Sequence, residues 1–199
     1  MRYGKEHKQA TRQRIIEAAG RRLKTDGIDG SGVATLMTDA GLTNGAFYAH
    51  FESKDDLVAT AVSHELQAQR ESLGELPPGR AGVEHLVREY LSVGHRDNPG
   101  LGCPSAALLD EIGRCTDATK EAYTEGLVAF IEDFAARLAP HDPRSARARV
   151  LSIYAGMIGT LQLSRALADR KLADEVLEEG LRNALTLMSG ADEGAAESD

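Results

Sequence analysis

The sequence contains no tryptophan and little of what marks cross-linked or membrane-spanning proteins. Its only two cysteines, Cys103 and Cys115, form no C-x-x-C pair and have no histidine at zinc-finger spacing. Two free thiols are therefore expected. No run approaches the roughly 20 apolar residues of a membrane span. The N-terminal stretch lacks the apolar core of a secretory signal, so we expect a cytoplasmic protein with no membrane association.

Motifs of the common enzyme classes are also missing. There is no G-x-S-x-G, no H-E-x-x-H, no P-loop and no glycine-rich dinucleotide fingerprint. The six histidines are scattered, and no two of them have the spacing of a metal-ligand pair. We therefore expect no enzyme, and the sequence predicts no catalytic residue, no metal site and no cofactor.

Charge is distributed unevenly along the chain, whose formal net charge is −8. Residues 1–54 hold nine basic and six acidic residues, whereas the remaining 145 residues hold 14 basic and 25 acidic ones. A cationic N-terminal segment on an anionic body is expected when only that segment meets a phosphate backbone. A solvated first helix would give the same charge, so composition alone leaves both interpretations open.

Helical periodicity runs through the chain, and no segment alternates convincingly at a period of two residues. Glycine- and proline-containing breaks divide it, most clearly at Leu76-Pro77-Pro78-Gly79. We predict helices over 9–25, 33–40, 44–50, 53–72, 81–93, 105–112, 117–138, 144–168 and 172–188. Ser53 is expected to cap the helix over 53–72. The inner face of that helix is expected to carry Leu57, Val58, Ala61, Val62 and Leu66. The pattern predicts an all-α fold, in which a small head of short helices precedes a helical bundle. The small, acidic tail over 191–199 is expected to be disordered.

The segment from Val33 to Lys54 has the order helix, glycine turn, helix. Gly41 suits the positive φ angle that ends the first of these helices. Phe47 and Phe51 lie four residues apart and are expected to pack inward. The remaining faces of the second helix carry Thr43, Asn44, Gly45, Ala46, Tyr48, Ala49 and His50. This is the order of a helix-turn-helix, whose second helix enters the major groove of DNA with its N-terminal end.

Residues 40–57, AGLTNGAFYAHFESKDDL, resemble the helix-turn-helix signature of TetR/AcrR-type transcriptional regulators. That signature reads A-G-[VL]-[ST]-x-G-x-[FL]-Y-x-[HY]-F-x-[ST]-K-x-x-L. The preceding R-x-x-I-x-x-A-A, which begins at Arg12, is similar to the first helix of the family. The resemblance implies a three-helix DNA-binding domain over 1–55 and a helical bundle for ligand binding and dimerisation over 56–190. Double-stranded operator DNA and a small-molecule effector are the implied partners.

The resemblance also implies roles for single residues in binding DNA. Thr43 would cap the recognition helix and touch phosphate, and Asn44 would read a base edge. Gly45 would let the backbone approach the groove. Phosphate contacts would come from Tyr48, His50 and Lys54. The complete predicted set is Thr43, Asn44, Gly45, Ala46, Tyr48, Ala49, His50 and Lys54.

Three positions depart from the family pattern. Asn44 replaces a residue that is often basic, Ala49 replaces a common aromatic residue, and Glu52 replaces a common lysine or arginine. The surface of the second helix that would contact the bases therefore carries little positive charge. Affinity for DNA is then expected to depend on the N-terminal cations Lys5, Lys8 and Arg12.

A homodimer is implied by the resemblance, because two recognition helices must reach major grooves about 34 Å apart. The pairing would use the two C-terminal helices, about 144–168 and 172–188. The expected interface stripe comprises Val150, Ile153, Tyr154, Met157, Leu161 and Ser164, with the small residues Ala155, Gly156 and Gly159 beside it. The same stripe would also complete the core of a single protomer, and the sequence leaves both interpretations open.

The family further implies an effector pocket between the middle helices. The predicted ligand-binding residues are Tyr90, Cys103, Tyr123, Phe130, Phe134, Tyr154 and Gln162. Each aromatic residue is individually more typical of ordinary core than of a ligand wall. Gln162 is a polar residue among apolar ones, as a site with one oriented polar contact would have.

Cys103 suggests a different kind of signal. A Gly-Cys step at the start of a helix recurs in some family members, and a thiol there can be reactive. One alternative is therefore a repressor that senses oxidants or electrophiles through Cys103; the other interpretation of this residue is a small buried hydrophobe. From a different class, a protein-interaction module with an inactive helix-turn-helix would show no salt-dependent binding to duplex DNA.

Overall fold

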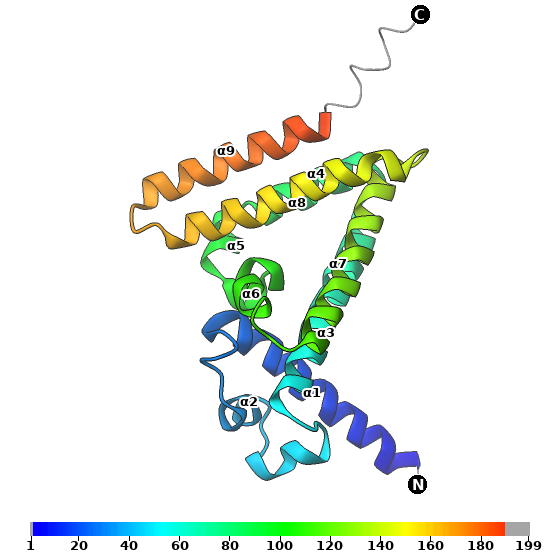
Figure 1. Cartoon of the computed structure of the whole chain (residues 1–199), viewed down its shortest axis with the longest axis vertical. Coiled ribbons are helices and arrows are strands. Elements are labelled where there is room, and N and C mark those ends of the chain that lie inside the picture. The colour runs from blue at the N-terminus through cyan, green and yellow to red at the C-terminus, as the bar shows by residue number, and fades with distance from the viewer. Residues whose placement is uncertain (1, 190–199) are drawn as a thin grey trace, which may run out of the picture. The chain divides into compact units, whose positions relative to one another are not determined.

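The computed structural model describes residues 2–189, with the side chains of residues 6–189, and none of these residues forms a β-strand. The predicted tail over 191–199 lies outside this range. The α-helices are α1 Arg2–Asp26, α2 Val33–Asp39, α3 Lys54–Glu75, α4 Arg80–Tyr90, α5 Val93–Asp97, α6 Pro104–Ile112, α7 Asp117–Leu138, α8 Pro143–Ala166 and α9 Arg170–Ser189 (Figure 1). The short 3-10 helices are η1 Asn44–Ala49 and η2 Pro99–Leu101. The predicted all-α class is confirmed.

The chain divides into two compact units. Unit 1 comprises residues 1–68 and 99–127, and unit 2 comprises residues 69–98 and 128–199. The boundaries fall within α3 and α7, so each of these helices contributes to both units. Unit 1 thus contains η2, α6 and the start of α7, which the division of the sequence at residue 55 assigns to the second domain.

Helix positions follow the sequence closely, with two informative differences. Helix α7 has the predicted bounds. Helix α2 ends at Asp39, one residue before its predicted end, and Gly41 follows with a positive φ of 68°. Helix α1, however, begins at Arg2 rather than near residue 9, because the sequence of its first turns has no apolar periodicity from which a helix could be predicted. The segment after Gly41 is a 3-10 helix rather than a regular α-helix.

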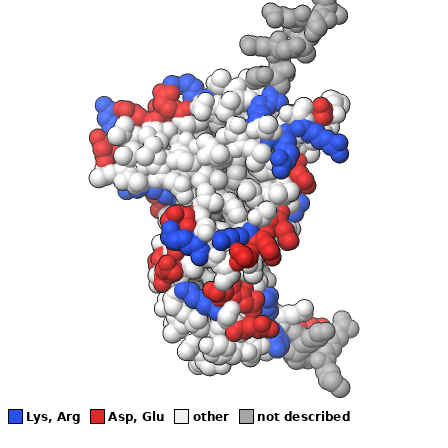
Figure 2. Space-filling view, viewed as in Figure 1, with Lys and Arg blue, Asp and Glu red and all other residues white. Residues whose placement is uncertain are grey.

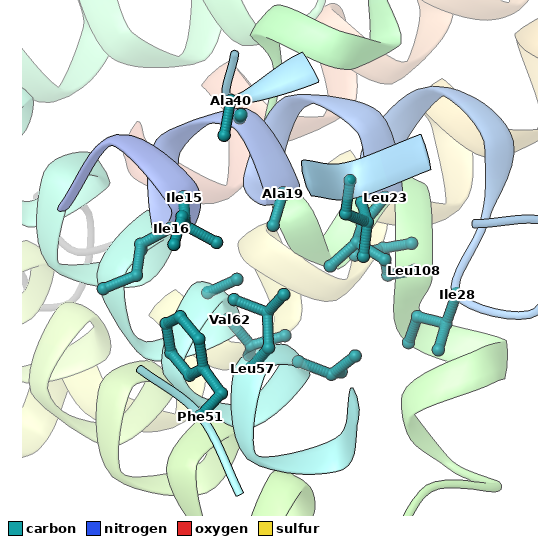
Figure 3. Close-up of a cluster of buried hydrophobic side chains, with 14 of the residues drawn as sticks. Ile15, Ile16, Ala19, Leu23, Ile28, Ala40, Phe51, Leu57, Val62 and Leu108 are labelled. Carbon is teal, nitrogen blue, oxygen red and sulfur yellow. The ribbon is translucent and has the colours of Figure 1, made fainter. Parts of the chain in front are cut away.

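Unit 1 is built around the buried face of α1. Ile15, Ala19 and Leu23 are fully buried and point toward Leu57 of α3 and Leu108 of α6 (Figure 3). The i, i+4 spacing of these α1 residues places them on one face, where apolar burial contributes about 25 cal/mol per Å². Helix α6 therefore shares one hydrophobic core with the helix-turn-helix.

A buried ion pair adds a polar connection within this core. Lys24 of α1 is 6% exposed, and its Nζ donates to Glu65 of α3 at 2.5 Å and to the carbonyl of Gly102 at 2.9 Å. A Cβ at Gly20 would collide with the Glu65 carboxylate, so glycine at that position leaves the space this pair needs. At the other end of α6, Glu111 accepts hydrogen bonds from the backbone N–H groups of residues 28 and 29.

Unit 2 is organised by the pair α8 and α9, which run antiparallel side by side (Figure 1). They approach closely at Gly180, where a Cβ would collide with the Thr160 methyl group. Helix α5 is fixed to this pair by buried Arg96, which binds Asp174 of α9. Arg165 of α8 donates to two carbonyl groups of α5.

Candidate nucleic-acid interface and effector site

The helix-turn-helix is held by its own backbone and by a small apolar core. The N–H groups of Gly41 and Leu42 donate to the carbonyls of Thr38 and Met37, which is the hydrogen-bond pattern of a Schellman motif. Phe47 is fully buried. We call residues 43–51, which contain η1, the recognition segment. Its buried face and the turn before it follow directly from the local sequence.

The other faces of the recognition segment are open to solvent. Tyr48 is 76% exposed although it is a large aromatic residue, and Thr43, Asn44, Gly45 and Ala49 are exposed with it. Ala46 and His50 are partly buried. A Cβ at Gly45 would meet no protein atom within 4 Å, so packing within the protomer does not require glycine there. The predicted residues of η1 are therefore all at least partly accessible to solvent.

The structure corrects one predicted role and adds a contact to a second residue. Thr43 occupies the N-cap position of η1, but its side chain makes no capping hydrogen bond, which corrects the prediction of a cap. Lys54, expected at phosphate, donates from Nζ to the carbonyl of Ile28 at 2.5 Å. This contact braces the loop between α1 and α2, and no local sequence pattern signals it because the partners are 26 residues apart.

The predicted cap of the next helix is present. The hydroxyl of Ser53 accepts from the N–H of Asp56, and the Asp56 carboxylate accepts from the N–H of Glu52. Such a cap stabilises a helix by about 1 kcal/mol. It fixes the point at which the chain turns from the recognition segment into α3.

Aromatic rings connect the recognition segment to α1. Tyr48 packs edge-on against Phe47 with ring centroids 5.1 Å apart, and Phe47 stacks on Phe51 at 5.8 Å. The guanidinium of Arg12 lies 4.7 Å from the centroid of the Phe51 ring. A cation–π contact at an exposed site contributes about 0.5–1 kcal/mol.

Charges near this surface shift two pKa values. Burial lowers the pKa of His50, and the positive charges of Lys8 and Arg12 lower it further. Hydrogen bonding to Arg22 lowers the pKa of Asp39, and this ion pair ties the end of α2 to α1. His50 is therefore a neutral group beside two cations at neutral pH.

Comparison with known proteins identifies this region. Residues 15–61 match the family of "Bacterial regulatory proteins, tetR family". Over 105 residues the chain is 39% identical to the "Probable HTH-type transcriptional regulator ArpR" and 37% identical to the "HTH-type transcriptional regulator TtgR", both of Pseudomonas putida. The helix-turn-helix region of this chain is thus similar to that of TetR-family regulators. Each match spans 53% of this chain and 42% of the relative's length.

Two solved structures share the fold of this chain. The reduced form of Escherichia coli NemR superimposes with a TM-score of 0.72 at 18% identity, covering 89% of this chain and 96% of NemR. The transcriptional regulator FadR of Bacillus subtilis, in complex with stearoyl-CoA, superimposes with a TM-score of 0.60 at 16% identity, covering 85% of this chain and 97% of FadR. The likeness in fold therefore extends over both units.

Four of the five aromatic residues predicted for the effector site, Tyr90, Phe130, Phe134 and Tyr154, gather in unit 2. The ring centroids of Phe130 and Tyr154 are 5.1 Å apart, those of Tyr90 and Tyr154 are 6.3 Å apart, and those of Phe130 and Phe134 are 6.0 Å apart. All four residues are at most 5% exposed. In the structure they form a packed aromatic cluster.

Two polar residues join this cluster that the sequence did not single out. Gln69 donates from Nε2 to the Tyr154 hydroxyl at 3.5 Å, and His95 packs edge-on against Tyr90 at 4.7 Å. Gln69 is 85 residues away from Tyr154 along the chain, so no spacing rule could have associated it with the aromatic residues. Predicted Gln162 is partly buried on α8.

Cys103 and Tyr123, also predicted as ligand residues, lie in unit 1 instead. The Tyr123 hydroxyl donates to buried Ser105 at 2.9 Å, and burial raises the pKa of this phenol. Cys103 is buried at the N-cap of α6. The predicted ligand-binding set is thus divided between two separate units.

The stripe predicted for the dimer interface is buried inside the protomer. Its six residues, Val150 to Ser164, are at most 3% exposed because they close the core of unit 2. The three small residues that were predicted beside it, Ala155, Gly156 and Gly159, are exposed instead, in a stripe of α8 that also comprises Ala148, Leu151, Ser152 and Leu163. The apolar periodicity of the sequence therefore marked the core side of the helix and not its free side.

Within the described residues, no group of three or more histidine, cysteine, aspartate or glutamate side chains is arranged to hold a metal ion. Across the same residues, no helix is long and apolar enough to cross a membrane.

Proposed function

We propose that this chain is a ligand-responsive, DNA-binding transcriptional repressor that acts as a homodimer in the cytoplasm. The observation that carries the proposal is the exposed recognition segment after Gly41, in a region that matches the TetR family. Tyr48 is a solvent-exposed aromatic residue whose hydroxyl can donate to a phosphate oxygen. Asn44 lies near it in sequence and offers both a donor and an acceptor to a base edge.

Homodimerisation supplies the second recognition segment. Figure 2 shows that the visible face of α8 and α9 is largely free of charged side chains. Small residues such as Gly156 and Gly159 line the exposed stripe of α8, and Leu163 is 53% exposed on it. Small side chains permit close helix approach, and a two-fold arrangement of α8 and α9 would form a four-helix interface.

The effector is proposed to bind at the aromatic cluster of unit 2. Tyr90 and Tyr154 offer hydroxyl groups and Gln69 an amide among apolar rings, which suits an uncharged organic molecule with one or two polar groups. Because the cluster is closely packed, the ligand must displace side chains to enter. Helices α3 and α7 run through both units, so such a displacement can alter the head that presents η1.

Binding to duplex DNA tests the proposal. The purified chain is titrated with DNA flanking its own gene over a series of salt concentrations, beside a random duplex of equal length. Tight binding that falls steeply with salt and prefers the flanking DNA is the expected result. Equal, weak binding to both duplexes, and to random genomic fragments, would contradict the function.

A charge introduced into the exposed stripe tests the dimer. Leu163→Glu is expected to convert the dimer into a monomer in sedimentation experiments, because two like charges would meet across the two-fold axis. Leu101→Glu is the matched control, since Leu101 is a 79% exposed leucine in unit 1. A wild-type chain that is monomeric at micromolar concentration, or a dimeric Leu163→Glu, would contradict the proposed interface.

A second candidate function is sensing of electrophiles through Cys103. The carbonyl of the preceding residue, Gly102, accepts a hydrogen bond from buried Lys24 of α1, so a group attached to Cys103 would disturb a contact of the head. Cys115 is the weaker candidate, because burial and nearby carboxylates raise the pKa of its thiol. Treatment with N-ethylmaleimide, which adds to the sulfur, should weaken DNA binding by the wild type but not by Cys103→Ser. An equal effect on both would exclude this thiol.

A further inference from the structure

Helix α5 is the shortest α-helix of the described chain, and it borders the aromatic cluster of unit 2. It has five residues, and the N–H of Arg96 donates to the carbonyl of Ser92. So short a helix is stable only through its contacts with the rest of the fold. By contrast, α8 and α9 have 24 and 20 residues and pack on each other. Of the helices around the cluster, α5 is therefore the one that opens most readily.

Two contacts place α5 against the aromatic cluster. The His95 ring packs edge-on against Tyr90 at 4.7 Å, and its Nδ1 donates to the Tyr90 carbonyl at 2.8 Å. Tyr90 in turn packs on Tyr154, and both tyrosines are at most 5% exposed. Helix α5 thus keeps one side of the cluster closed, and its displacement opens that side.

An ionic network fastens α5 to α8 and α9, beside which it lies in Figure 1. The guanidinium of Arg96 donates to Asp174 of α9 at 2.5 Å and to the adjacent Asp97 at 2.9 Å. Arg170 of α9 lies 3.3 Å from Asp97. From α8, Arg165 donates to two backbone carbonyls of α5 at 2.8 and 3.1 Å. All of these residues belong to unit 2.

The network joins a buried cation to exposed acids. The side chain of Arg96 is 5% exposed, whereas those of Asp97 and Asp174 are 43% and 51% exposed. Leaving the guanidinium buried without its partners would be costly, so the carboxylates hold α5 in place. Because water reaches both carboxylates, they regain hydration when α5 leaves. Such a network keeps a segment closed and still lets it open.

We propose that α5 is the gate through which an effector enters the aromatic cluster, and that the pair Arg96–Asp174 is the latch that keeps the gate closed. The inference rests on the proposed effector site and adds its entry route. The latch is made whether or not a ligand is present, so it sets how fast a ligand enters and leaves rather than how tightly it binds. Asp174 is thus a positioning residue, which does not touch the ligand.

Binding kinetics of an uncharged aromatic probe test the gate in the full chain. Stopped-flow fluorescence follows N-phenylnaphthylamine, whose emission rises in apolar surroundings. Asp174→Asn keeps the size of the side chain but weakens the bond to Arg96. We expect it to raise the association and dissociation rate constants by about tenfold each and to change Kd by less than about twofold. Asp97→Asn should act in the same direction.

The matched control is Glu178→Gln, which removes an exposed carboxylate from the same helix, α9, and should retain the wild-type rates. A thermal melt and sedimentation of each variant verify its folding and oligomeric state. Hydrogen exchange follows the gate without any ligand. The amides of residues 93–98 should exchange about tenfold faster in Asp174→Asn than in wild type, whereas those of α8 should not change.

The outcomes separate the gate from the site behind it. Wild-type probe kinetics in Asp174→Asn would overturn the gate, even if its α5 amides exchange faster, and so would a faster dissociation that appears wholly as a weaker Kd. Phe130→Leu removes a ring of the cluster and should raise Kd for the probe at least about threefold. If wild type does not bind the probe, or Phe130→Leu binds it equally well, the proposed effector site is wrong, and the gate with it.

Discussion

Units 1 and 2 expose different chemistry on surfaces built from the same kind of amphipathic helix. Unit 1 presents the recognition segment with Tyr48 and the cations of α1. Unit 2 presents a stripe of alanine, glycine and leucine along α8. Hydrogen-bond donors and positive charge suit a polyanion, whereas small uncharged residues suit a second helix pair.

Their interiors differ as well. The core of unit 1 contains the ion pair Lys24–Glu65 and its carbonyl partner Gly102, which join α1, α3 and the start of α6. The centre of unit 2 is an aromatic cluster around Tyr154 and Phe130. A polar contact demands a fixed geometry of three segments, whereas aromatic packing tolerates rearrangement around a guest molecule. Unit 1 is thus suited to hold the DNA-contacting surface in a fixed shape, and unit 2 is suited to rearrange when a ligand binds.

The largest expected effect is in the core of unit 2. Phe134→Ala should lower the free energy of unfolding by about 3–5 kcal/mol, because it leaves a cavity in place of a fully buried ring. Phe134→Leu should cost less than about 1.5 kcal/mol. Chemical denaturation measures both, and a loss below about 1 kcal/mol for the alanine variant would mean that the cluster is loosely packed.

Breaking the ion pair of unit 1 should have a comparable but slightly smaller effect. Lys24→Ala leaves Glu65 as an unpaired charge in the core, and we expect a loss of about 3 kcal/mol in stability. The double variant Lys24→Met/Glu65→Leu removes both charges and should recover most of that loss. A double variant that is no more stable than Lys24→Ala would contradict the view that the unpaired charge of Glu65 causes the loss.

Tyr48→Ala distinguishes the contribution of the exposed surface to DNA binding from the contribution of the core to stability. Because Tyr48 is 76% exposed, its loss should leave the melting temperature unchanged and weaken binding to the flanking duplex by about tenfold, or about 1.4 kcal/mol. Titration of the duplex and a thermal melt measure the two quantities. Unchanged binding by a folded variant would remove this face from the DNA interface.

The smallest predicted effect concerns the cap of α3. Ser53→Ala removes the acceptor for the N–H of Asp56 and should cost about 1 kcal/mol of stability. Ser53→Asp keeps an acceptor and should retain it. Thr43→Ala is the contrasting variant, since Thr43 makes no capping bond and its loss should leave stability unchanged. Equal losses for Ser53→Ala and Thr43→Ala would contradict the assigned caps.

Predictions from sequence succeeded where the signal is local. The buried face of α3 was expected at Leu57, Val58, Ala61, Val62 and Leu66, and all five are at most 1% exposed. The glycine turn and the cap at Ser53 were likewise predicted, because each depends on neighbouring residues. On α8 the sequence singled out the small residues Ala155, Gly156 and Gly159 but placed the apolar stripe from Val150 to Ser164 at the interface as well, because periodicity does not tell which apolar face of a helix is covered by its own protomer.

The sequence by itself determined that this chain is helical, where most helices begin and end, and that residues 33–54 form a helix-turn-helix. These features depend on apolar periodicity, glycine and caps, which act within a few residues. Only the tertiary structure decided that Glu111 holds a loop 83 residues away, that Lys54 braces Ile28, and that Cys103 and the aromatic cluster lie in different units. Such contacts join residues whose distance along the chain carries no information, and packing of the helices alone brings them together.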